Sequence, residues 1–105
     1  MEYRHYLSAG FDYLYDKVGM YDTIREVICG QQSTCAITSA WQQTDDIRDH
    51  MLYFLENHDE QRIASSFFAS DARKGVPGLL VSALLQQNPL MLYAGQEYGE
   101  RGMDK

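Results

Sequence analysis

One short stretch near the middle of the chain is dense in side chains that can do chemistry. This stretch reads Glu56-Asn57-His58-Asp59-Glu60-Gln61-Arg62. A carboxylate beside an imidazole, as in His58 and Asp59, can bind a metal ion, act in acid–base catalysis, or hold hydroxyl groups through charge-assisted hydrogen bonds. A lone pair of this kind is more often part of a solvated loop that caps a helix. The strands and helices predicted around the pair therefore indicate whether it is a functional site or a capping loop.

The polar stretch follows directly after Met51–Leu55, an apolar run with the composition of a buried strand. A second apolar run begins at Pro89 and ends in the same way, at Gly95-Gln96-Glu97. Two strands that each end in polar residues, with a helical segment between them, predict a parallel β/α/β unit. Because functional residues collect at the carboxyl ends of parallel strands, the sequence predicts a site at that edge of the sheet.

The remaining segments predict further strands and helices around this unit. The expected elements are a short strand over 10–16, a helix over about 22–29 that Gly30 ends, a helix over about 33–42, a short helix over 63–68, and a longer helix from an Asp71 cap to about Gln87. Residues 44–46 are expected to break the helical pattern. The last helix carries an apolar stripe of Val76, Leu79, Leu80, Ala83 and Leu84, with Pro77 in its first turn.

The composition argues against some classes of binding partner. The 105 residues carry a formal net charge of −6 without any stripe of lysine or arginine, which argues against nucleic acids and anionic membranes. No run approaches the roughly 18 apolar residues of a membrane span. A neutral ligand such as a sugar suits this charge, and the chain has eight tyrosines that could contact it.

The two cysteines do not define a cofactor site. The spacing of Cys29 and Cys35 matches neither a redox Cys-x-x-Cys pair nor a zinc knuckle. Two separate thiols are the favoured interpretation, with a local disulfide as the alternative. No metal or other cofactor is therefore expected.

Two motifs resemble the α-amylase family of glycoside hydrolases. The segment 53–59, with its aromatic start and its Asn-His-Asp end, is similar to that family's seventh strand, and 89–99 is similar to its eighth. Gly10-Phe11-Asp12 fits the sixth strand less distinctively. The resemblance implies an α/β fold that is a partial (β/α)8 TIM barrel, with about three parallel strands and flanking helices. Residues 1–105 would then be a single fragment of the catalytic domain, with both ends cut.

The resemblance also implies roles for individual residues. The family cleaves or transfers α-glucosidic bonds with retention, and the motifs that carry its nucleophile and its acid/base are not in this sequence. Asp59 would be the third carboxylate, which stabilises the transition state, with His58 and Asn57 binding substrate beside it. Supporting roles are expected for Glu56, Arg62, Tyr93 and Glu97. The isolated chain is thus expected to be inactive, to self-associate, and to retain part of the sugar site, with an α-glucan or oligosaccharide as the ligand of the parent enzyme.

Two other functions stay open on the residues alone. The chain could be a complete small binding module that buries its open sheet in an oligomer. It could also be a small metal-dependent hydrolase built on His58 and Asp59. The second option is weaker, because His50 precedes its strand and belongs at the opposite end of the sheet from His58.

Overall fold

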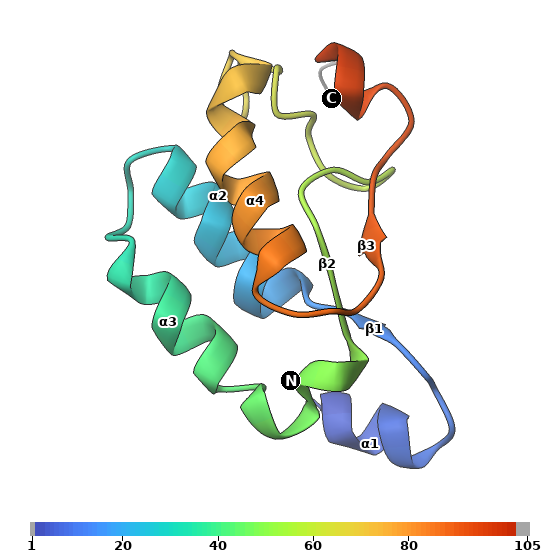
Figure 1. The fold of residues 1–105 in the computed structure, drawn as a ribbon. Helices are drawn as coiled ribbons and strands as arrows, with labels where there is room; N and C mark the ends of the chain where they lie inside the picture. Colours follow the sequence, from blue (N-terminus) through green and yellow to red (C-terminus); the bar gives the residue numbers. More distant parts are fainter. Residues whose placement is uncertain (1, 103–105) are drawn as a thin grey trace.

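The computed structural model describes residues 2–102, which contain an open sheet of three parallel strands with helices around it (Figure 1). The strands are β1 (Leu14–Tyr15), β2 (Met51–Phe54) and β3 (Leu90–Met91). They lie in the order β1-β2-β3, with Leu14 opposite Met51 and Tyr53 opposite Leu90. The α/β class with three parallel strands is therefore confirmed. The sheet is open, and no barrel closes within residues 2–102.

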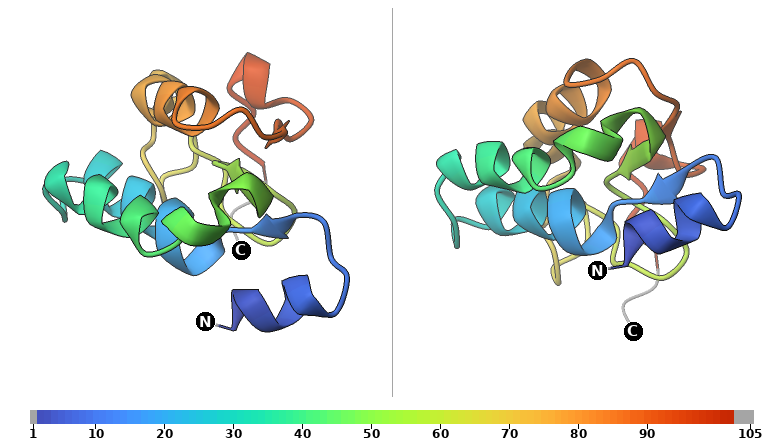
Figure 2. Two further views of the ribbon diagram at one scale, coloured as in Figure 1. Left: turned by 60° about the horizontal axis from the view of Figure 1, so that its bottom comes forward. Right: turned by 90° about the horizontal axis from the view of Figure 1, so that it is seen from below.

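Four α-helices and four short helices complete the described part of the chain. The α-helices are α1 (Tyr3–Ser8), α2 (Asp22–Ile28), α3 (Cys35–Gln42) and α4 (Val76–Leu84). The short helices are η1 (Lys17–Tyr21), η2 (Asp45–His50), η3 (Ala72–Gly75) and η4 (Gln96–Tyr98). Figures 1 and 2 show α2, α3 and α4 grouped on one side of the strands, whereas α1 lies near η2, where β2 begins.

Several predicted elements are confirmed near their expected places. α2 and α3 lie within the two helices predicted from the sequence, and Gly30 follows α2 in the left-handed conformation with φ 74°. Pro77 lies in the first turn of α4, where its missing N–H leaves no intrahelical bond unmade. Cys29 and Cys35 are separate free thiols, so the alternative of a local disulfide is not realised.

Other elements differ from the prediction. The strand expected over 10–16 is reduced to Leu14–Tyr15, and the long helix expected over 71–87 is divided into η3 and α4, which ends at Leu84. α1 was not expected, and 45–50 form η2 where only a break in the pattern was predicted.

The helix expected over 63–68 is a series of turns instead. The hydroxyl of Ser65 accepts a hydrogen bond from the N–H of Phe67, and the carbonyl of Ile63 accepts one from the N–H of Ala69. Side-chain bonds of this local kind compete with the regular ladder of a helix. The predicted helix is therefore wrong, because the Phe67 amide binds the Ser65 hydroxyl and the Ile63 carbonyl binds the Ala69 amide, which replaces the regular helical pattern.

The core lies between the strands and the grouped helices. Tyr21, Ile24, Met51, Phe54 and Leu55 are each at most 1% exposed, and the rings of Tyr21 and Phe54 stack with centroids 4.8 Å apart. α4 approaches closely at Gly78, where a Cβ atom would lie only 2.7 Å from the Ile24 side chain. The absence of a side chain at this glycine lets α4 pack directly over α2 and β2.

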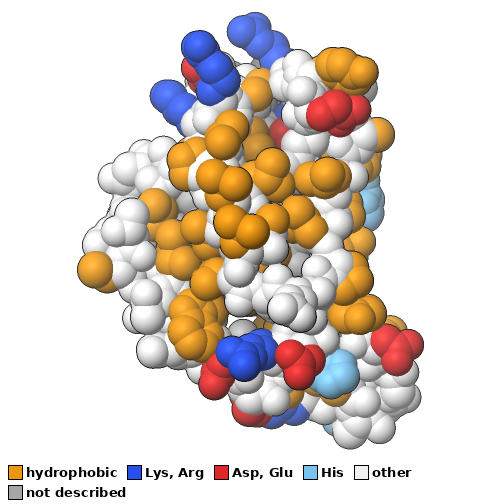
Figure 3. Space-filling model, viewed as in Figure 1, with side chains coloured by type: hydrophobic (Ala, Val, Ile, Leu, Met, Phe, Trp, Pro, Cys, Tyr) orange, Lys and Arg blue, Asp and Glu red, His pale blue; other side chains and the backbone are white. Residues whose placement is uncertain are grey.

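The apolar stripe of α4 is largely uncovered. Val76, Leu80 and Leu84 are 51%, 53% and 77% exposed, whereas the buried residues of the helix are Gly78 and Ser82. Figure 3 shows hydrophobic side chains gathered over this part of the molecule. The helix thus packs inward at its small residues and at Leu79 and Val81, whereas Val76, Leu80 and Leu84 form an exposed apolar face that a further surface could cover.

Candidate functional site

The segment that follows β2, residues 56–62, is called the β2 loop here, and a buried ion pair closes it. Glu56 is 1% exposed, and its Oε2 accepts a hydrogen bond of 2.9 Å from Nε of Arg62. Its other oxygen accepts one of 2.7 Å from the N–H of Ile63. Charge-assisted bonds of this length are the strong ones, so the two ends of the loop are held firmly together.

Arg62 also connects the β2 loop to the end of β3. Its Nη2 donates to the carbonyl oxygen of Ala94 at 2.9 Å, and its guanidinium lies 4.9 Å from the centre of the Tyr93 ring. Glu56, Arg62 and Tyr93, which were predicted to support the site, are therefore in mutual contact through Arg62. One side chain spans the carboxyl ends of two neighbouring strands.

Asn57 shapes the turn that carries the two candidate site residues. Its Oδ1 accepts hydrogen bonds of 2.9 Å from the N–H groups of both Asp59 and Glu60. A short polar side chain that binds the backbone two and three residues ahead fixes a tight turn. The turn projects His58 and Asp59 outward, where Nε2 and Oδ2 lie 3.3 Å apart and each side chain is 74% exposed.

A small hollow lies beside this turn. It has a volume of about 180 Å³ and is lined by Asn57, His58, Glu60, Gln61, Arg62, Tyr93 and Gly102. Asp59 is outside this lining and joins the hollow through its contact with His58. Glu97 is exposed and borders a separate hollow of about 360 Å³ with Glu56 and Tyr98. The structure thus brings together all the predicted site residues except Glu97.

Glu60 also belongs to this candidate site, although the sequence pattern predicted no role for it. Its carboxylate lies 3.4 Å from Nζ of Lys17 and 3.6 Å from Nη1 of Arg25, and it accepts a hydrogen bond of 3.4 Å from the Tyr21 hydroxyl. These partners are 35 to 43 positions away along the chain, so no local pattern could have revealed them.

A second buried carboxyl, Asp16, stands at the end of β1. It is 0% exposed, and its Oδ1 accepts hydrogen bonds of 3.0 Å from the Tyr3 hydroxyl and from the N–H of Gly19. Burial raises the pKa of this carboxyl, an effect that these hydrogen bonds only partly oppose. Burial and the nearby Asp16 also raise the pKa of Tyr3, which remains a proton donor. Asp16 holds α1 and η1 to the sheet and has no surface on which to meet a ligand.

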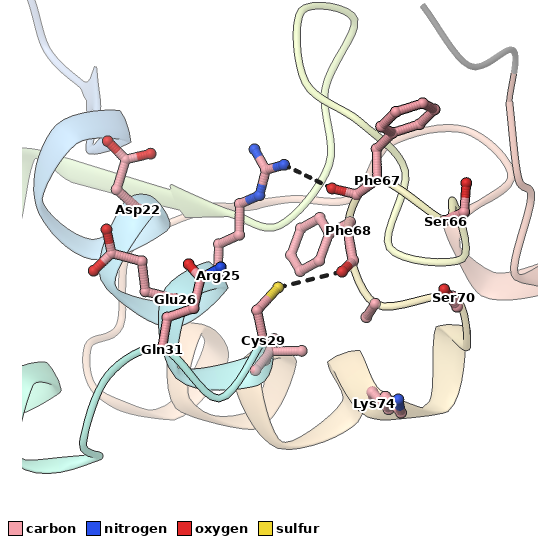
Figure 4. A pocket seen from close by; sticks show the side chains of 12 residues that line it. Asp22, Arg25, Glu26, Cys29, Gln31, Ser66, Phe67, Phe68, Ser70 and Lys74 are labelled. Carbon is pink, nitrogen blue, oxygen red and sulfur yellow. Dashed lines mark hydrogen bonds between the residues drawn. The ribbon is translucent and has the colours of Figure 1, made fainter.

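A larger hollow lies away from the β2 loop, between α2 and residues 66–70 (Figure 4). It has a volume of about 800 Å³ and a polar lining that includes Asp22, Arg25, Glu26 and Lys74. Arg25 donates to the Phe67 carbonyl at 3.0 Å across this hollow. None of the residues predicted for the site lies in its lining.

The exposed pair on a firmly held turn can bind hydroxyl groups. The carboxylate of Asp59 accepts hydrogen bonds, and the imidazole of His58 can donate or accept according to its protonation. Within residues 2–102, no three or more His, Cys, Asp or Glu side chains form a group that could hold a metal ion. Over the same residues, every helix is too short or too polar to cross a bilayer.

Comparisons of the chain with models of protein families, with curated proteins and with solved structures found no match.

Proposed function

We propose that this chain is part of a retaining glycoside hydrolase or transglycosidase of the α-amylase type, which acts on α-glucosidic bonds. Its three parallel strands would be strands six to eight of a (β/α)8 barrel. The main support for the proposal is the position of the Asn-His-Asp motif, which lies in the β2 loop at the carboxyl end of the central strand. There Asn57 fixes the turn that presents His58 and Asp59. That edge of a barrel sheet is where substrates bind in enzymes of this architecture.

In this proposal Asp59 grips hydroxyl groups of the sugar at the cleaved bond. A charged acceptor binds these hydroxyls more tightly as positive charge develops on the sugar ring in the transition state. His58 adds a second hydrogen-bonding group at 3.3 Å from the carboxylate. Arg62 and Tyr93 keep the neighbouring strand end in place beside the pair.

The catalytic nucleophile and the acid/base would come from other strands of the barrel. Retaining hydrolysis needs two carboxyl groups about 5–5.5 Å apart on either side of the bond. Neither motif that carries them is present here, so the isolated chain is expected to show no turnover of starch or of an aryl α-glucoside. Turnover that survives repurification and disappears in Asp59→Ala would contradict the proposal that the nucleophile and the acid/base come from other strands.

The direct test is made in the full-length protein that contains this segment. Asp59→Asn keeps the shape of the side chain and removes its charge, so we expect kcat on maltodextrin to fall at least about 10²-fold, the scale for losing one transition-state contact. The matched control is Asp12→Asn, an exposed residue before β1 at the opposite end of the strands. Near-normal kcat in folded Asp59→Asn would refute the proposed role.

A second candidate, self-assembly, is favoured by the exposed stripe of α4. Together with the unpaired edges of β1 and β3, it leaves apolar surface and backbone groups open to another copy of the chain. We expect the isolated chain to form dimers or larger oligomers at tens of micromolar, a concentration above a dissociation constant of about 1 μM. Leu80→Glu with Leu84→Glu should shift it toward monomer in sedimentation velocity. A monodisperse wild-type monomer would contradict the expectation.

A further inference from the structure

We propose that Glu60 is a positioning residue for the site: it is the acceptor through which Lys17, Tyr21 and Arg25 fix the turn that presents His58 and Asp59. This inference rests on the proposed function, since it concerns the geometry of the same sugar-binding turn. It adds a role for η1 and α2, which follow β1 and contribute no residue to the hollow beside His58.

The contacts of Glu60 converge from two helices. Lys17 and Tyr21 belong to η1, at 3.4 Å each, and Arg25 belongs to α2, at 3.6 Å. The Glu60 side chain is only 15% exposed, so water screens these contacts far less than it screens an ion pair on the open surface. Three donors from one neighbouring β/α unit therefore meet a single carboxylate of the β2 loop.

The donors are themselves held in place before they meet Glu60. Figure 4 shows Arg25 reaching from α2 to the Phe67 carbonyl, which it contacts at 3.0 Å, with its guanidinium 5.1 Å from the centre of the Phe68 ring. Tyr21 is stacked on Phe54, and burial raises its pKa, so its hydroxyl keeps the proton that it donates. Groups that are already ordered lose little conformational freedom when they bind.

Tyr21 is the partner that donates a hydrogen bond to Glu60, at 3.4 Å. The two cations each have a nearer contact, because Nζ of Lys17 lies 2.8 Å from Oδ1 of Asp22 and Nη2 of Arg25 lies 3.0 Å from the Phe67 carbonyl oxygen. Lys17 and Arg25 therefore contribute positive charge near Glu60 rather than close hydrogen bonds. Loss of the Tyr21 hydroxyl should consequently loosen the turn.

Glu60 attaches the loop to a second part of the molecule. The Glu56–Arg62 pair fixes the two ends of the loop, and Asn57 fixes the turn from within. Glu60 joins the turn to the neighbouring β/α unit, on the side away from β3. Without it, His58 and Asp59 would keep their local turn but could shift relative to the strand ends, and a displacement of about 1 Å is enough to weaken a site.

The test compares Glu60→Gln, which keeps the shape and removes the charge, with Glu2→Gln, an exposed control in the same chain. The first readout is amide hydrogen exchange of residues 58–61, measured by NMR. We expect exchange there to accelerate at least about fivefold in Glu60→Gln while the amides of β2 keep their rates, because a local opening needs no global unfolding. Unchanged exchange in the loop would overturn the proposal.

The second readout separates positioning from simple support of the fold. We expect the affinity of the chain for maltoheptaose to fall about fivefold in Glu60→Gln and in Tyr21→Phe, with little further loss in the double variant, since both changes weaken the same contact between Tyr21 and Glu60. Full additivity of the two losses would overturn the proposal. If the wild-type chain does not bind maltoheptaose, the sugar-binding function fails for this chain, and the exchange rates alone decide whether Glu60 holds the turn.

Discussion

The polar segments that follow β2 and β3 begin from similar sequence patterns but are held in different ways. After β2, Glu56 is buried and paired, Asn57 binds two backbone amides, and Glu60 meets three donors. After β3, Glu97 is exposed and Tyr98 is 87% exposed, in a tight turn between two glycines with positive φ. An apolar run that ends in polar residues therefore locates a strand end. Its long-range partners determine whether that end is fixed in one geometry.

The largest effect should come from removing the side chain on which both strand ends depend. Arg62→Met leaves Glu56 as an unpaired buried charge and also removes the contact with the Ala94 carbonyl. We expect the free energy of unfolding to fall by about 3 kcal/mol, the scale for breaking a buried pair from one side. Urea unfolding followed by circular dichroism measures it.

The matched control for that prediction is Arg4→Met. Arg4 and Asp46 form an ion pair of 2.6 Å, but both side chains are more than half exposed. Exposed pairs of this kind contribute little, because water screens them and two flexible side chains must be ordered. Equal losses in the two variants would mean that the Glu56–Arg62 pair is not what distinguishes the β2 loop.

The end of β1 holds a buried carboxyl, Asp16, whose contribution to the free energy of unfolding depends on pH. The expected effect lies between those at the ends of β2 and β3. Burial raises the folded-state pKa of Asp16 above its ordinary value of 3.8. Folding then favours the protonated form, so this contribution to stability is present below 3.8 and is lost as the pH rises through the raised pKa. Each unit of the shift corresponds to about 1.4 kcal/mol.

Asp16→Asn cannot titrate and should remove that dependence. We expect the unfolding free energy of the variant, relative to wild type, to increase as the pH rises from below 3.8 toward neutrality. The measurement is urea unfolding of both proteins across that range. Parallel pH profiles for the two proteins would show that burial does not perturb Asp16.

The smallest effect is expected at the end of β3. Glu97→Gln changes an exposed side chain that makes no hydrogen bond or ion pair within residues 2–102, so the unfolding free energy should stay within about 0.5 kcal/mol of wild type. The same urea titration checks it. A loss comparable to that of Arg62→Met would remove the contrast between the two strand ends and restore the supporting role that the sequence predicted for Glu97.

The sequence was sufficient for the features that depend on local pattern. The apolar run 51–55 predicted β2, the pattern around Pro77 predicted a helix close to α4, and the Asn-His-Asp stretch indicated where polar residues leave the sheet. The parallel order also followed, because strands separated by helices return in the same direction.

Features that depend on distant partners could not be predicted in this way. The burial of Asp16 depends on Tyr3, and the environment of Glu60 depends on Arg25. The turns over 63–68 arise because Ser65 binds the backbone amide of Phe67, which a helix over these residues would need. The stripe of α4 had the right spacing, but the helix packs closely at Gly78, and Val76, Leu80 and Leu84 are left outside.

We propose that the β2 loop presents His58 and Asp59 to a sugar. An NMR titration of the ¹⁵N-labelled chain with maltoheptaose tests this proposal directly, with the disaccharide cellobiose, a β-linked sugar, as the control ligand. We expect that amide shifts change at 57–62 and at Tyr93, that Asp59→Asn abolishes these changes, and that cellobiose causes none. Shift changes confined to the hollow between α2 and residues 66–70, or none at millimolar maltoheptaose, would contradict it.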